Sequence, residues 1–252
     1  MGWRGRSRVL VKDAVIAARR LALPPLRSVA PSRYSDADPY KIIAVPTDRL
    51  NTMQTRWEGR LDLPWLERGT FGRWSSHRRR WHAGRVLGGD WDFARQTLDD
   101  YHLSRIVHER FIERRDWREI HYIRRALKKV KRGERAWGGR CSTKAEVLAR
   151  CSYIDGLHER LLAGGYRADA ADDFTHFLVN IGRDGEVIRN NDGKHRIILS
   201  RLIGIAHLPA RVLVRHPDWQ TVRDRIRAGD RSLAIRHRDH PDLTDLVKPD
   251  AT

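Results

Sequence analysis

The feature that most constrains the fold is a change of hydrophobic period along the C-terminal half of the chain. Thr143 and Glu146 have the spacing of a capping box, and the apolar residues after them recur every three to four positions, which predicts a helix. Beyond this helix, short apolar segments typical of strands alternate with shorter helical segments. The predicted elements are a strand at 174–181, a hairpin turn at 184–185, a strand at 186–189, a helix at 194–202, a strand at 208–214 and a helix at 217–226. This order predicts an α/β or α+β fold.

The N-terminal half carries weaker patterns. Residues 9–23 have the period of a basic amphipathic helix, which Pro24 is expected to end. Residues 41–45 predict a strand, and amphipathic helices are predicted at 94–114 and 117–131. The predicted organisation is a basic N-terminal arm at 1–38, a strand with a Trp/Arg-rich insertion and helices at 39–139, a core at 140–228 and a polar tail at 229–252.

Net charge restricts the partners that such a chain can bind. Its 50 Lys and Arg residues exceed its 32 Asp and Glu residues, which gives a formal charge of +18. Residues 1–35 carry +7 of this charge and residues 73–140 carry +10, so the predicted core is almost neutral. A basic chain favours partners such as DNA, an anionic membrane surface or phosphorylated ligands. The alternative is an Arg-rich solvated surface that has no partner.

Composition excludes several classes of protein. No apolar run approaches the ~20 residues that a membrane-spanning helix needs, so we expect no transmembrane segment. Nine Trp, six Tyr and five Phe are too many large apolar side chains for a disordered chain. Cys141 and Cys151 are too few for a disulfide framework or for a zinc site made of cysteines alone. The N-terminus lacks the continuous apolar segment of a secretory signal, so we expect a cytoplasmic protein.

The second basic block contains a dense mixture of arginine and tryptophan at residues 73–85. Such a mixture suits phosphate contacts combined with base stacking, and therefore a DNA-binding surface. The residues that would form this surface are Trp74, Arg78, Arg79, Arg80 and Trp81. The alternative is that these arginines lie over aromatic rings at the surface of a folded insertion.

The motif that carries chemistry is Asp192-Gly193-Lys194-His195-Arg196, which lies between the predicted hairpin and the next helix. The start of a helix presents unpaired amides and the positive end of the helix dipole, and both stabilise an anion. Gly193 allows a tight turn and close approach of a ligand, while the next three residues supply up to three cationic donors. Asp192 has the wrong charge for phosphate alone. It suits a magnesium ion that bridges phosphates, or the orientation of His195.

With the elements around it, this motif resembles the phosphate loop of the ParB/sulfiredoxin superfamily. The resemblance covers residues 140–219 and, more weakly, the strand at 41–45. Sulfiredoxins carry their catalytic cysteine where this chain has Lys194, so sulfinic acid reductase activity is not expected. The resemblance implies a core that binds ATP or CTP, with the nucleotide phosphates on Gly193, Lys194, His195 and Arg196.

Within this superfamily, the motif is most similar to the Asp-Gly-His-His-Arg loop of free-serine kinases, with Lys194 in place of the first histidine. That similarity implies that Asp192 lies near magnesium and phosphate and that His195 takes part in catalysis beside it. The kinases also place a catalytic glutamate near the start of the helix that corresponds to 143–162. Glu146 is our candidate for that base, although its capping-box position offers a purely structural role. Further candidates are Glu134, Asp155 and Glu159.

These patterns lead to a main hypothesis and three alternatives. The main hypothesis is a magnesium-dependent phosphotransferase or NTPase that uses ATP or CTP and acts on a small molecule or sugar. The alternatives are a DNA-binding protein of the partition type, a non-catalytic module for phosphate or nucleotides, and an assembly protein that docks through its N-terminal arm. The near-neutral core and the lack of a helix-turn-helix pattern after the motif favour the nucleotide enzyme over the partition-type protein.

Overall fold

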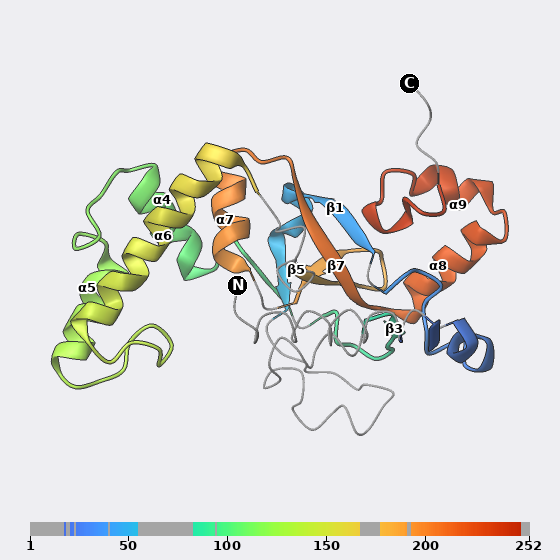
Figure 1. Ribbon diagram of the computed structural model, residues 1–252, viewed down its shortest axis with the longest axis horizontal. Helices are drawn as coiled ribbons and strands as arrows, with labels where there is room; N and C mark the ends of the chain where they lie inside the picture. Colours follow the sequence, from blue (N-terminus) through green and yellow to red (C-terminus); the bar gives the residue numbers. More distant parts are fainter. Residues whose placement is uncertain are drawn as a thin grey trace, which may run out of the picture.

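The chain combines helices and strands, as the sequence predicts (Figure 1). The computed structural model describes residues 18, 21–22, 24–39, 41–54, 83–93, 95–166, 177–190 and 193–247. A β-sheet occupies the middle of the molecule, with helices α4 to α7 at one end and helices α8 and α9 at the other. Within the described residues, no helix has both the length and the apolar character that crossing a membrane requires.

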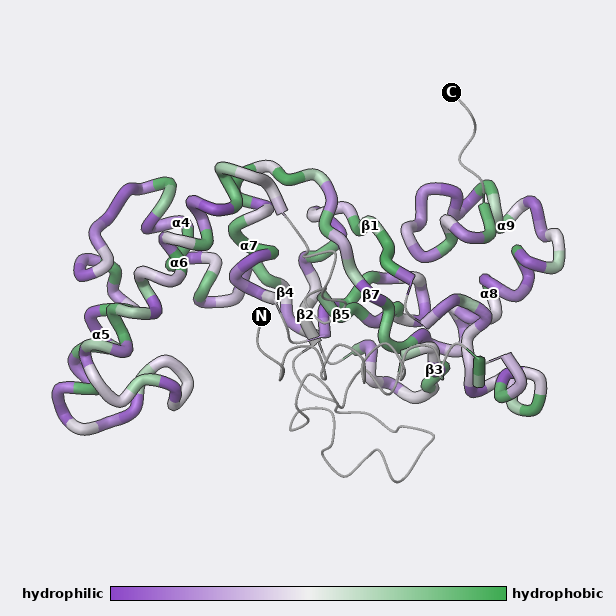
Figure 2. Tube along the Cα trace, viewed as in Figure 1, coloured by the Kyte–Doolittle hydropathy of each residue, from purple (hydrophilic) through white to green (hydrophobic). Residues whose placement is uncertain are grey.

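Seven strands in the described part of the chain form one mixed sheet around β7. In spatial order, six of them are β1 (Ile42–Pro46), β7 (His207–Arg215), β5 (Phe177–Ile181), β6 (Val187–Arg189), β2 (Thr52–Gln54) and β4 (Arg95–Thr97). The seventh strand, β3 (Arg85–Val86), pairs with β7 on the same edge as β1. β1 runs antiparallel to β7, and β5 runs parallel to it. β5 and β6 form the predicted hairpin, in which Val179 lies opposite Arg189. Hydrophobic segments along β1, β5 and β7 lie together in the middle of the molecule (Figure 2).

The helices follow the predicted periods closely in the C-terminal half. Those labelled in Figure 1 are α4 (His102–Phe111), α5 (His121–Lys131), α6 (Lys144–Gly164), α7 (Lys194–Leu202), α8 (Pro217–Arg227) and α9 (Arg231–Arg236). The predicted capping box is confirmed at the start of α6, where the Glu146 amide donates to the Thr143 hydroxyl at 3.2 Å. The apolar stripe of α6 is buried, and its members are Val147, Cys151, Ile154, Leu157 and Leu161.

One large apolar cluster contains residues from three of the predicted parts of the chain, 39–139, 140–228 and 229–252. Its members include Ile43, Ile123, Val147 and Leu243. The boundary predicted after Gly139 therefore does not separate two cores. The predicted polar tail is also folded, into α9 and the 3-10 turn η3 (Pro241–Leu243), because Leu233 and Leu243 are buried in the large apolar cluster.

Two predictions for the N-terminal half are wrong. Residues 95–97 do not begin a helix but form β4, and α4 begins only at His102. Pairing with β2 and a hydrogen bond from the Leu98 amide to the Asn51 carbonyl satisfy backbone groups that a helix would otherwise use. Residues 24–29 are helical, so Pro24 does not end the helical segment. Residues 21–22, before this proline, are helical as well.

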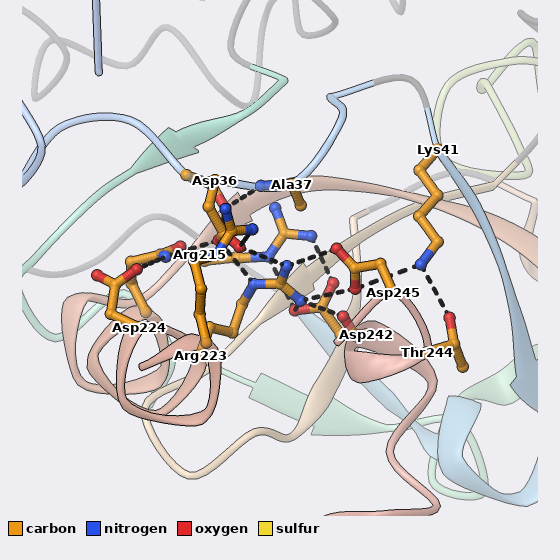
Figure 3. A network of polar contacts seen from close by, with 12 residues as sticks. Asp36, Ala37, Lys41, Arg215, Arg223, Asp224, Asp242, Thr244 and Asp245 are labelled. Atoms are coloured by element: carbon orange, nitrogen blue, oxygen red, sulfur yellow. Dashed lines mark hydrogen bonds and ion pairs between the residues drawn. The ribbon is translucent and has the colours of Figure 1, made fainter. Parts of the chain in front are cut away.

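A buried network of arginines and aspartates ties the N- and C-terminal segments to the sheet (Figure 3). Arg215 on β7 makes a two-point contact with Asp242, and its Nε lies 2.8 Å from one carboxylate oxygen. Arg223 on α8 donates from Nε to Asp36 at 2.9 Å and from Nη2 to Asp245 at 2.8 Å. A terminal nitrogen of Arg223 also lies 3.5 Å from the Asp242 carboxylate. The network therefore joins β7 and α8 to the two segments at the ends of the described chain.

Burial makes each partner in this network necessary. The side chains of Arg215, Arg223 and Asp242 are at most 3% exposed. Burial by itself would raise the pKa of Asp242, but the charges of Arg215 and Arg223 lower it to about 2, so the carboxylate stays ionised. Trp219 donates from Nε1 to the same carboxylate at 2.9 Å. Removing one partner from such a group leaves a buried charge without compensation.

Replacing Asp242 by Asn should destabilise the fold by about 3 kcal/mol or more, because Arg215 and Arg223 would lose their shared counter-charge in a buried setting. Asp239→Asn is the control, since that side chain is 80% exposed and lies 3.6 Å from Arg238. The control should change stability by less than about 0.5 kcal/mol. Urea unfolding at pH 7 measures both variants. Equal unfolding midpoints would contradict the prediction.

Candidate functional site

The turn before α7 is built around Gly193. This residue has a φ of 71° and precedes the helix without a side-chain cap. A Cβ at this position would overlap the ring of Phe177 on β5, so only glycine fits between the strand and the turn. The Ile197 amide bonds back to the Gly193 carbonyl at 3.1 Å, and the amides that precede it have no intrahelical acceptor. The predicted tight turn at the start of a helix is confirmed.

Aromatic residues hold two of the predicted cations beside this turn. The Lys194 ammonium donates to the Tyr101 hydroxyl and lies 4.6 Å from the centre of that ring. The Arg196 guanidinium donates to the Tyr166 hydroxyl at 3.0 Å, and its central carbon lies 4.9 Å from the centre of the Phe177 ring. A neutral hydroxyl or a ring fixes the position of a cation without cancelling its charge. These contacts therefore position Lys194 and Arg196 beside the turn.

His195, between these two residues, is neutral rather than cationic. Burial lowers its pKa to about 4, and the charges of Lys194, Arg150, Arg140 and Arg189 act in the same direction. At pH 7 the side chain is therefore an uncharged imidazole. The expectation of three cationic donors in this turn is wrong, because burial and neighbouring positive charge oppose protonation of the ring.

The charges that act on His195 include two arginines from other elements of the fold, Arg189 on the preceding strand and Arg150 on α6. Arg189 is buried on β6 opposite Val179, so by strand alternation it faces the same side of the sheet as Phe177. Arg150 lies on α6, with its guanidinium carbon 5.2 Å from the centre of the Trp137 ring. Sequence reasoning missed both residues. An arginine at a buried position of a predicted strand was the available signal for Arg189.

Glu146, the predicted base, belongs to the cap of α6. Its carboxylate accepts from the Ser142 amide at 2.6 Å, from the Ser142 hydroxyl at 2.9 Å and from the Thr143 amide at 3.2 Å. These hydrogen bonds lower the pKa of Glu146, so the side chain is a carboxylate at neutral pH. It lies one helical turn before Arg150 on the same helix. A catalytic role for Glu146 stays a prediction.

Six other predicted site residues lie outside the described part of the chain: Asp192, Trp74, Arg78, Arg79, Arg80 and Trp81. Asp155, a further candidate base, accepts instead from Arg110 at 3.0 Å and from the Trp117 indole at 2.7 Å. Cys141 and Cys151 are buried free thiols, and burial raises the pKa of Cys151 to about 12. Among the described residues, no group of three or more His, Cys, Asp or Glu side chains could hold a metal ion.

The turn combines the first amides of a helix, a glycine backbone that a ligand can approach closely, and cations from several elements. Such an arrangement suits an anion, and phosphate above all, because its oxygens accept from amides and guanidinium groups together. No protein-family model, curated protein or solved structure matches the chain. The resemblance to the ParB/sulfiredoxin superfamily therefore stays a prediction, and the function has to come from the geometry of this turn.

Gly193→Ala should destabilise the fold by more than Gly204→Ala does. Both glycines have positive φ, 71° and 76°, so backbone strain should cost about 1 kcal/mol or slightly more at either position. Only at Gly193 would the new methyl group overlap Phe177, whereas nothing lies within 4 Å of a Cβ at Gly204. Urea unfolding of the two variants isolates the effect of the close approach. Equal losses of stability in the two variants would contradict the prediction, because they would mean that the Phe177 ring moves aside at no cost.

Proposed function

We propose that this chain binds a nucleotide through its phosphates at the turn formed by Gly193 and the first residues of α7. The observation that carries the proposal is the gathering of cations around His195. Burial lowers the pKa of this ring to about 4, and the charges of Lys194 and of three arginines act in the same direction. A site with this excess of positive charge favours a ligand with several negative charges, as a nucleotide phosphate chain has.

The components of the turn have complementary tasks toward phosphate. The amides at the start of α7 donate to phosphate oxygens, and Gly193 lets those oxygens come close to the backbone. Arg196 offers a planar fork for two oxygens, with Tyr166 and Phe177 fixing its plane. Lys194, held beside Tyr101, adds a point charge.

An exposed aromatic ring favours a nucleotide over inorganic phosphate. Tyr153 on α6 is 54% exposed, and its ring stands edge-on to His195 with centroids 6.0 Å apart. A ring that is accessible beside an anion site can stack on a base or pack against a sugar. His195 is neutral there and can exchange hydrogen bonds with a ribose or a phosphate oxygen.

Within this proposal, the C-terminal half is a ParB/sulfiredoxin-like core, and the reaction is phosphoryl transfer from ATP or CTP, or hydrolysis of it. The β5–β6 hairpin followed directly by α7 and β7 supports this assignment. A bound magnesium ion would neutralise charge on the phosphates, and it takes most of its ligands from phosphate and water. Asp192 is proposed to hold that ion, with Glu146 as the proposed base. A non-catalytic nucleotide module has the same turn, and turnover distinguishes the two.

Arg196→Ala should abolish nucleotide binding, because it removes the bidentate donor at the start of α7. Arg196→Lys should restore only part of the affinity, since a point charge cannot reproduce the fork. Arg201→Ala is the matched control, because this residue lies at the other end of α7 and bonds Asn51 at 2.8 Å. Isothermal titration with ATP and with CTP, in the presence of magnesium, measures all three variants. Full affinity in Arg196→Ala would overturn the phosphate site.

Asp192→Asn should separate catalysis from phosphate binding. If Asp192 holds magnesium, the variant should lose turnover by orders of magnitude, because the metal neutralises charge in phosphoryl transfer. Binding of metal-free nucleotide should survive or tighten, since one repulsive charge has been removed. The measurement is nucleotide affinity with magnesium and with a chelator, in the wild type and in the variant. Identical magnesium dependence in the two proteins would contradict the metal role.

A further inference from the structure

Helix α5 presents a surface of uniform positive charge. Its 11 residues, His121–Lys131, include no acidic side chain. Its basic residues are Arg124, Arg125, Lys128, Lys129 and Lys131. In Figure 1, α5 lies at the end of the molecule opposite to α9, beyond the sheet and the other helices of its layer. The exposed side chains of this helix therefore lie at one end of the molecule.

The basic residues of α5 are segregated to one side of the helix. At about 100° per residue, Arg124, Lys128 and Lys131 fall within about 60° of one another, with Arg125 beside them. All four are exposed. Ile123, on the other side, is completely buried in the core, where α5 packs against α6. The apolar side of α5 therefore packs into the core, and the basic side faces solvent.

The charges of this face have no counter-charge in the part of the chain that the structure describes. No ion pair there includes a residue of α5, whereas several arginines elsewhere are paired with carboxylates. Arg110 pairs with Asp155 at 3.0 Å, and Arg183 pairs with Asp92 at 2.9 Å. Like charges four residues apart, as at Arg124 and Lys128, repel each other and disfavour the helix. A polyanionic partner would remove that repulsion.

We infer that the exposed basic face of α5 binds the phosphate backbone of double-stranded nucleic acid. The helix is ~16 Å long at 1.5 Å per residue. A duplex carries one negative charge per about 1.7 Å of its axis, so the face meets several phosphates at once. Binding releases the counterions condensed on those phosphates. The inference is independent of the nucleotide site at Gly193.

The surroundings of α5 favour a duplex over a membrane or a single strand. A helix that lies on a membrane needs exposed apolar residues beside its basic ones. Residues 116–140 are all described, and none is an exposed large hydrophobic side chain. Single strands need accessible rings for base stacking. The nearest rings, Tyr122 and Trp137, are half-buried and pack against each other with centroids 5.5 Å apart.

The test compares two triple variants of the full chain that lose the same charge. The first carries Arg124→Gln, Lys128→Gln and Lys131→Gln, where glutamine keeps the helix propensity of the site. The control carries Arg33→Gln, Arg231→Gln and Arg236→Gln, which are exposed positions outside α5. Fluorescence anisotropy with a labelled DNA duplex, measured over a series of salt concentrations, gives the affinity and its salt dependence.

The wild type and the control should bind the duplex with the same slope of log affinity against log salt. The α5 variant should bind more weakly, with a slope smaller by up to about 0.9 for each lost contact and so by up to about 2.7. Arg196→Ala should bind the duplex like the wild type, which separates this inference from the proposed nucleotide site. An unchanged slope in the α5 variant, an equal loss in the control, or binding to anionic vesicles but not to the duplex would each overturn the inference.

Discussion

Two buried guanidinium groups, those of Arg215 and Arg223, share the carboxylate of Asp242, and this pairing attaches both ends of the described chain to the sheet. Arg223 extends the contact to Asp36, close to the N-terminal end of β1. Buried ions cost several kcal/mol each, by order of magnitude, unless partners compensate for lost water. The positions of α8, η3 and the segment before β1 therefore depend on one another. Moving any one of them would leave a buried charge without its partner.

The basic residues of the chain lie in different surroundings. Arginines inside the fold meet carboxylates, as Arg215 meets Asp242. Lys194 and Arg196, at the start of α7, meet tyrosine hydroxyls and aromatic rings, which hold them in place. The basic residues of α5 have no ion pair within the described chain. The basic residues of the described chain thus include both structural ion pairs and the exposed face of α5.

The proposed nucleotide site depends on the sheet as much as on its own motif. The Phe177 ring on β5 lies so close to the turn that position 193 accepts only glycine. Arg189 reaches the same side of the sheet through the register of the β5–β6 hairpin. A shift of one residue in that register would turn Arg189 to the opposite face. The hairpin therefore positions the charge that a phosphate would meet.

The sequence by itself predicted those elements whose signals are local. The capping box at Thr143, the hairpin and the helix that starts after Gly193 follow from spacings within a few residues, and the structure confirms them. Only tertiary structure turned residues 95–97 into a strand, because pairing with β2 outweighs local helical period. It also brought Arg150 to His195 and made that histidine neutral, since burial and the sum of distant charges depend on which segments meet in space.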